Sequence, residues 1–169
     1  SLHMHYGWDA EKVVANALFA DGAGALVATG AAGAAGAAAD APPLQVLASG
    51  STLIPGSSDL MSWTIADHGF EMTLSAKVPA AVAAHLRPWL ERWLSARGEG
   101  LPGIGSWALH PGGPRILAAV ATAVELEPSQ IAPSAAVLRQ FGNMSSATIL
   151  FILERLRQSN APRPWVALA

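Results

Sequence analysis

Two short segments in the second half of the chain hold residue types that could carry out acyl-transfer chemistry. His110 ends the apolar run 104–109 (IGSWAL) and is followed by Pro-Gly-Gly-Pro. Asn143 lies in the segment 141–148 (FGNMSSAT). An imidazole and a carboxamide can both donate N–H hydrogen bonds, and donors that converge on one oxygen stabilise the negative charge that develops on a thioester carbonyl. If the two segments meet in space, they predict such a site.

Each segment also has a simpler interpretation. His110 could be a half-buried residue that hydrogen-bonds to the backbone at the end of a strand. Asn and Ser are common N-caps, so Asn143, Ser145 or Ser146 could do no more than begin the next helix. Composition and spacing alone leave both interpretations open for both segments.

The elements around His110 are those that would hold a reacting group in place. We expect a short buried strand over 104–109 and a helix over 114–124, with Gly112 and Gly113 between them. The glycines allow a ligand or another backbone to approach closely. The unpaired N–H groups at the start of the helix, with their partial positive charge, would point back toward His110.

The rest of the chain alternates between strand and helix patterns. A tight turn that leads into a buried strand is predicted at 19–27, and further strands at 44–53, 61–66, 70–75 and 165–168. Helices are predicted at 9–18, 79–97 (kinked or split at Pro88), 134–141 and 145–158. The Ala/Gly-rich segment 28–43 is expected to be a surface loop without chemistry. This alternation predicts an α/β fold in which a mixed β-sheet is layered with α-helices.

Composition excludes several classes of function. The net charge of −2 gives no electrostatic footprint for nucleic acid. Residues 1–86 contain two Lys/Arg and seven Asp/Glu, and residues 87–169 contain eight Arg and five Glu. These arginines are spread over several predicted helices, which indicates a solvated surface. The absence of cysteine rules out a disulfide, a thiolate metal site and a cysteine nucleophile within these 169 residues.

Neither a metal site nor a membrane segment is expected. The other four histidines show no convincing metal-ligand spacing: His3, His5, His68 and His85. No uncharged apolar run approaches the ~20 residues that span a bilayer. The first residues lack the pattern of a secretory signal.

Four segments carry a resemblance to a known family. HPGGPRIL (110–117) and VLRQFGNMSSATILFILERLR (137–157) resemble the C-terminal half of the chalcone synthase-like type III polyketide synthases. ALFADGAGALV (17–27) resembles the strand of that family that follows the interdomain segment. DLMSWTIADHGFEMTLSAKVP (59–79) is similar to the bacterial members in particular. The resemblance covers almost all of the chain except 28–43. It identifies residues 1–169 as a chalcone/stilbene synthase C-terminal domain, the second half of a thiolase-like fold.

The resemblance implies roles for particular residues. Members condense a starter acyl-CoA with malonyl-CoA at a Cys–His–Asn triad, without a metal or other cofactor. His110 and Asn143 match the histidine and the asparagine of that triad. Phe19 matches one gatekeeper phenylalanine, and the second gatekeeper position falls on Met72. The remaining matches are glycines near the pantetheine path and a residue that lines the cavity: Gly112, Gly113 and Ser145.

The sequence also departs from the family. The half that carries the nucleophilic cysteine and the basic residues for the coenzyme A phosphates is absent, as is the glycine-rich loop expected after residue 169. We therefore expect the isolated chain to be inactive, and the complete enzyme to be a cytoplasmic homodimer. The alternatives are a ketoacyl-carrier-protein synthase III-like condensing domain and a non-catalytic assembly or dimerisation domain of the same fold.

Overall fold

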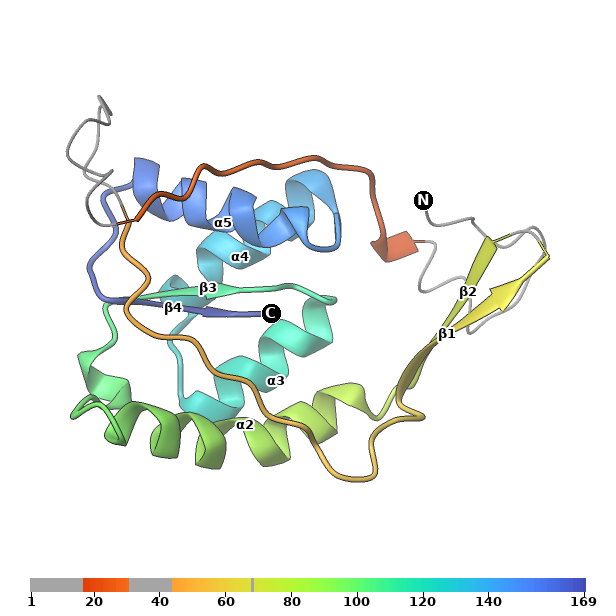
Figure 1. The fold of residues 1–169 in the computed structure, drawn as a ribbon, viewed down its shortest axis with the longest axis horizontal. Coiled ribbons are helices and arrows are strands. Elements are labelled where there is room, and N and C mark those ends of the chain that lie inside the picture. Colours follow the sequence, from red (N-terminus) through yellow and green to blue (C-terminus); the bar gives the residue numbers. More distant parts are fainter. Residues whose placement is uncertain (1–16, 31–43, 68) are drawn as a thin grey trace.

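Two parallel strands lie between two groups of helices in the computed structural model, which describes residues 17–30, 44–67 and 69–169 (Figure 1). Strand β3 (Ser106–Leu109) pairs with β4 (Trp165–Leu168), and Leu109 lies opposite Leu168. Because the side chains of a strand alternate between its faces, β3 contributes to two cores.

The first core joins β3 to the helices on one side of the strands. Trp107 and Leu109 of β3 pack there against α2 (Val78–Ser95) and α3 (Pro114–Val124). Its buried residues are Leu90, Leu94, Ile104, Trp107, Leu109, Leu117, Val120, Val124 and Val166. Helix α2 continues through Pro88, where the sequence predicts a kink or a break.

The second core lies on the opposite face of β3. Ala108 is fully buried there, against α4 (Pro128–Phe141) and α5 (Ala147–Gln158). Helix α4 begins six residues before the predicted start. Pro128 occupies its first turn and the Glu127 backbone N–H donates to Gln130 Oε1 at 2.9 Å, an arrangement that suits a helix start.

A β-hairpin projects from one end of this body (Figure 1). Its strands are β1 (Met61–Ala66) and β2 (Gly69–Leu74), close to the predicted ranges. Register places apolar residues on one face: Met61, Trp63, Ile65, Met72 and Leu74. The other face carries Ser62 and Thr73, whose hydroxyl oxygens lie 2.6 Å apart.

The strands predicted at 19–27 and 44–53 are wrong. Phe19 forms one isolated bridge, while residues 20–30 and 44–54 are extended without belonging to a ladder. A strand needs a neighbouring strand to pair its backbone groups. Here helices lie beside the segments instead: a Cβ placed on Gly24 would lie 2.9 Å from Leu150 Cδ1 of α5, and one on Gly50 would overlap Trp93 of α2.

Some predicted features lie outside the described residues. These are most of the helix at 9–18, most of the loop at 28–43, and His3, His5 and His68. Within the described ranges, no helix is long and apolar enough to cross a bilayer.

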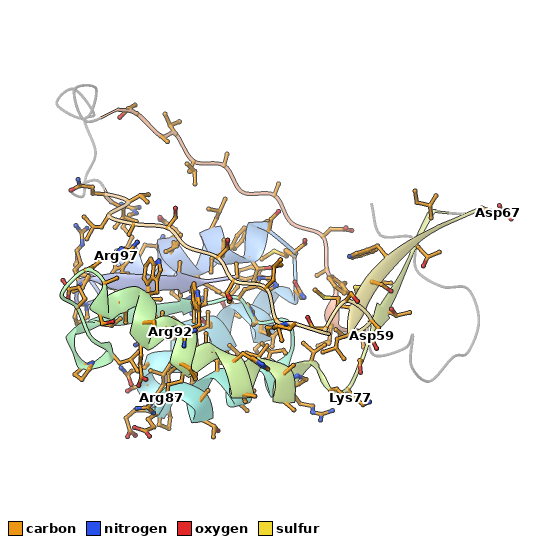
Figure 2. The ribbon with its side chains drawn as sticks, turned by 60° about the horizontal axis from the view of Figure 1, so that its bottom comes forward. Asp59, Asp67, Lys77, Arg87, Arg92 and Arg97 are labelled. Carbon is orange, nitrogen blue, oxygen red and sulfur yellow. The ribbon has the colours of Figure 1, made fainter. Side chains whose placement is uncertain are left out.

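Two arginines, one in α2 and one just after it, have local partners; Figure 2 labels both, Arg87 and Arg97. Arg87 pairs with Glu91 and Glu125, both at 2.8 Å. Arg97 donates to the backbone oxygen of Trp93 and lies 4.4 Å from the centre of its ring. The solvated-surface interpretation therefore fits these two charges.

Candidate active site

His110 stands at the end of β3, where the parallel pair ends. Its backbone N–H donates to Leu168 O at 2.8 Å, which extends the β3–β4 ladder by one bond. The side chain is half-buried, and this burial lowers the pKa of the imidazole below its ordinary value. The neutral ring is therefore favoured near neutral pH.

The turn after His110 is built from the two glycines. Gly112 N–H donates to His110 O at 3.1 Å, and Gly113 precedes α3 with a φ of 155°, which a side chain would rarely allow. A Cβ on Gly113 would also lie 3.3 Å from Leu18 Cδ1. Gly113 thus lets the segment that ends at Phe19 approach the start of α3.

Asn143 is buried in the turn between α4 and α5. Its Oδ1 accepts the backbone N–H of Ser145 at 2.9 Å, an interaction that fixes the plane of the amide. Helix α5 begins after Ser146, which makes no side-chain capping hydrogen bond. Asn143 therefore stabilises its own turn and does not cap α5. The turn is tightened further by Ser145, which has a positive φ of 55°, and by Thr148 Oγ1, which accepts the Met144 N–H at 2.8 Å.

Residues 18–20 bind this turn through the backbone. Asn143 N–H donates to Leu18 O at 2.8 Å, and Ala20 N–H donates to Asn143 O at 2.9 Å. Phe19 therefore lies directly opposite Asn143. The same Leu18 contacts Gly113 through its side chain, so one segment connects the two sequence motifs.

The structure thus gathers most of the predicted site residues at one end of the parallel strands. Asn143 hydrogen-bonds to Ser145 and to Leu18 and Ala20, the residues on either side of Phe19, and Gly113 lies close to the Leu18 side chain. Met72 lies in the hairpin, where it is buried opposite Trp63. Figure 1 shows the hairpin projecting beyond the end of β3 that carries His110.

Sequence reasoning missed one polar residue beside the site. Ser134 of α4 is fully buried, and its Oγ accepts the Leu109 N–H at 3.0 Å. A signal was present in the sequence: Ser134 interrupts an apolar helical stripe that runs from Ile131 to Val137 and Leu138.

With this geometry in place, comparison with known proteins identifies the family. The sequence model of the chalcone and stilbene synthases, C-terminal domain, matches residues 45–165. The chain belongs to this family. That membership confirms the resemblance carried by the HPGG and GNMSSAT segments, and it disfavours the ketoacyl-carrier-protein synthase alternative.

A relative and a solved structure agree with the assignment. The chain is 38% identical over 164 residues to a 1,3,6,8-tetrahydroxynaphthalene synthase from Streptomyces peucetius subsp. caesius, with 97% of this chain covered. It spans 43% of that protein, less than half of its length. PKS-I from the brown alga Ectocarpus siliculosus superposes with a TM-score of 0.61 at 30% identity, over 63% of this chain and 28% of that one.

This likeness confirms the predicted fold class of the domain, which is α/β and thiolase-like. Both kinds of strand pairing occur, but in two separate two-stranded sheets, antiparallel β1–β2 and parallel β3–β4. Among the described residues, no three His, Cys, Asp or Glu side chains are grouped as metal ligands would be.

An apolar hollow of about 460 Å³ lies beside the candidate site, between α3, α4 and residues 17–18. Its lining residues are Ala17, Leu18, Pro114, Leu117, Ala118, Ile131, Ala135, Leu138, Arg139 and Gly142. No predicted site residue lines it. The hollow is therefore a neighbour of the candidate site, which it meets at Leu18 and Gly142.

Proposed function

We propose that this domain supplies the histidine and the asparagine of a Cys–His–Asn site that condenses a starter acyl-CoA with malonyl-CoA. The observation that carries the proposal is the fixed amide of Asn143. Its Oδ1 is engaged by the Ser145 N–H, so its NH₂ group is held on the opposite side of the amide. The turn is itself tied to the segment whose Leu18 side chain lies against Gly113, three residues after His110.

In the proposed reaction the two side chains hold the thioester oxygen of malonyl-CoA through N–H donors. Loss of carbon dioxide breaks the carbon–carboxylate bond and leaves its electron pair in an enolate, whose oxygen carries the negative charge. Donors placed in advance stabilise that charge, and each contributes about 10²–10³ in rate. The enolate carbon then attacks the acyl thioester on the cysteine, a carbon–carbon bond forms, and the thiolate leaves.

The cysteine is proposed to come from a first half of the same enzyme, because this domain has none. Without a thiolate nearby, burial keeps the pKa of His110 below its ordinary value. A thiolate within ~4–6 Å would oppose that effect, because an opposite charge favours the imidazolium. The ion pair would in turn activate the cysteine as a nucleophile. We therefore propose that the isolated domain forms no condensation product.

The remaining members of the proposed site are Phe19, Met72, Gly112, Gly113 and Ser145, as contacts for the thioester substrates. Met72 in place of a gatekeeper phenylalanine gives a more flexible thioether wall. We also propose a homodimeric complete enzyme that works in the cytoplasm on coenzyme A thioesters. Exposed apolar side chains such as Val27, at 93% exposure, support association with further protein.

The test is product formation by the complete enzyme from acyl-CoA and radiolabelled malonyl-CoA. His110→Gln and Asn143→Ala are each expected to lower kcat by about 10²-fold or more. His85→Gln is the matched control, since His85 is exposed on α2 and its ring bonds only to the Ala81 carbonyl in its own helix. If His110→Gln and His85→Gln had the same activity, a non-catalytic assembly role would replace the proposal.

A further inference from the structure

The buried hydroxyl of Ser134 lies against the strand that carries His110. Ser134 Oγ accepts the Leu109 N–H at 3.0 Å, and Ser134 and Leu109 are 0% and 1% exposed. Helix α4 thus reaches the last residue of β3, immediately before His110 along the chain.

The direction of this hydrogen bond follows from the strand pairing. Ser106 N–H and His110 N–H both point to β4, where they donate to the carbonyl oxygens of Pro164 and Leu168 at 3.3 and 2.8 Å. Because N–H groups alternate along a strand, that of Leu109 points to the opposite edge. In the described part of the chain, β3 pairs with no second strand at that edge. Ser134 occupies the place that a strand carbonyl would take.

An unpaired N–H in this position would be costly. A buried backbone donor without an acceptor must find water or move. Either response shifts the peptide between Ala108 and Leu109, which lies one residue before His110. A shift there is passed on along the backbone to the base of the imidazole. Since reacting groups have to be held within fractions of an ångström, a small shift is enough to lower the rate of a reaction.

We propose that Ser134 is a positioning residue for His110: through the Leu109 N–H it fixes the peptide between Ala108 and Leu109, at the end of the strand that carries the histidine. The inference rests on the proposed function, because positioning matters only if His110 acts on substrate. Ser134 does not touch the substrate. Its hydroxyl acts through one backbone hydrogen bond, together with the Leu168 carbonyl on the other edge of the strand.

The test compares four variants of the complete enzyme. Ser134→Ala removes the acceptor, Ser134→Cys keeps the size but accepts weakly, and Ser134→Thr keeps the hydroxyl. Ser129→Ala is the control, because Ser129 is an exposed serine in the first turn of the same helix. Two readouts are measured on each: kcat and KM for malonyl-CoA, and deuterium exchange in the peptide 106–113.

We expect activity to follow the hydroxyl. Ser134→Ala and Ser134→Cys should lower kcat about tenfold with KM within about twofold, and both should accelerate exchange at the Leu109 amide. Ser134→Thr should recover kcat and slow exchange, and Ser129→Ala should match the unaltered enzyme. The Cys variant keeps the test decisive if the Ala variant does not fold.

Three results would overturn the inference, and each would contradict a different part of it. Unchanged exchange in Ser134→Ala would mean that the hydrogen bond is absent. Faster exchange with unchanged kcat would mean that the bond does not position His110. Full activity of His110→Gln would remove the proposed function itself, while the exchange data would still report on the Ser134 bond.

Discussion

The body of the molecule and its extended segments use apolar residues in opposite ways. In the body, which comprises α2–α5, β3 and β4, Leu90 and Ile152 are fully buried. In the extended segments, 20–30 and 44–54, Val27 and Leu53 are each 93% exposed. Apolar character alone therefore does not place a residue in the core of this domain. The body differs from the extended segments in that its elements have packing partners on both sides.

The clearest contrast should appear in amide exchange. The backbone N–H groups of the extended segments lack a ladder, whereas those of α2 and β3 sit in helical or strand bonds within a core. Exchange in the segments should be at least about a thousandfold faster than at the core amides of the isolated domain. The measurement is deuterium uptake over time. Equal protection would mean that the segments pair with partners in solution and would remove the contrast.

Core truncation should separate the regions next. Leu90→Ala is expected to lower the free energy of unfolding by about 2–5 kcal/mol, because it leaves a cavity among tightly packed side chains. Leu53→Ala, the same change at an exposed position, should stay within about 0.5 kcal/mol. Urea denaturation of both variants gives the comparison. Similar losses would show that Leu53 is buried in the protein in solution.

Glycine substitutions test the same contrast through the backbone. A Cβ on Gly105, before β3, would lie 2.6 Å from Pro162 O, whereas one on Gly30 would meet nothing within 4 Å. Gly105→Ala should therefore cost about 1–3 kcal/mol as an overpacking change. Gly30→Ala should cost less than about 0.5 kcal/mol. Thermal unfolding of the two variants would contradict this expectation if their midpoints coincided.

A smaller effect, the pH dependence of stability, should report how far the His110 side chain is buried at the end of the body. Burial lowers the pKa of His110 in the folded state, so the unfolded chain binds its proton more readily. The contribution to stability is present above the unfolded pKa of about 6.5 and is lost as the pH falls below that value toward the folded pKa. Glu154, whose pKa is lowered to about 2 chiefly by Arg157, titrates far below this window.

The measurement is the stability of the unaltered domain and of His110→Gln between pH 7.5 and 5, a range of about one unit on either side of the ordinary histidine pKa. Stability of the unaltered domain should fall more steeply as the pH decreases. Parallel curves for the two proteins would mean that the His110 ring is solvated.

Sequence reasoning predicted the body much better than the extended segments. The ranges of α3 and β4 agree with the structure. A proline marks the start of α3, and β4 is a short apolar run. Helix α4 was predicted to begin too late, since Pro133 lies inside it and masks the earlier turn. Local patterns predict the helices because helical hydrogen bonds join residues that are near in sequence. Strand β4 was predicted from its apolar run alone, although it pairs with β3, which lies far from it in the sequence.

The extended segments show what the pattern could not supply. Residues 44–53 have the composition of a strand, but pairing depends on a neighbour that local sequence does not specify. The candidate site was predicted through two motifs, and the structure adds their connection through Leu18. Ser134 was missed because a serine among apolar residues gives no indication of which backbone group it will meet.

The two-faced register of the hairpin limits how its turn can change. Met61, Trp63 and Ile65 share one face only because side chains alternate along β1. An insertion that slips the register by one residue would exchange the faces and place Ser62 and Thr64 where the apolar residues now lie. Natural or designed relatives with a turn of another length should therefore shift the register by an even number of residues, so that each face keeps its side chains. In a library of turn variants selected for folding, variants that shift the register by one residue should be lost.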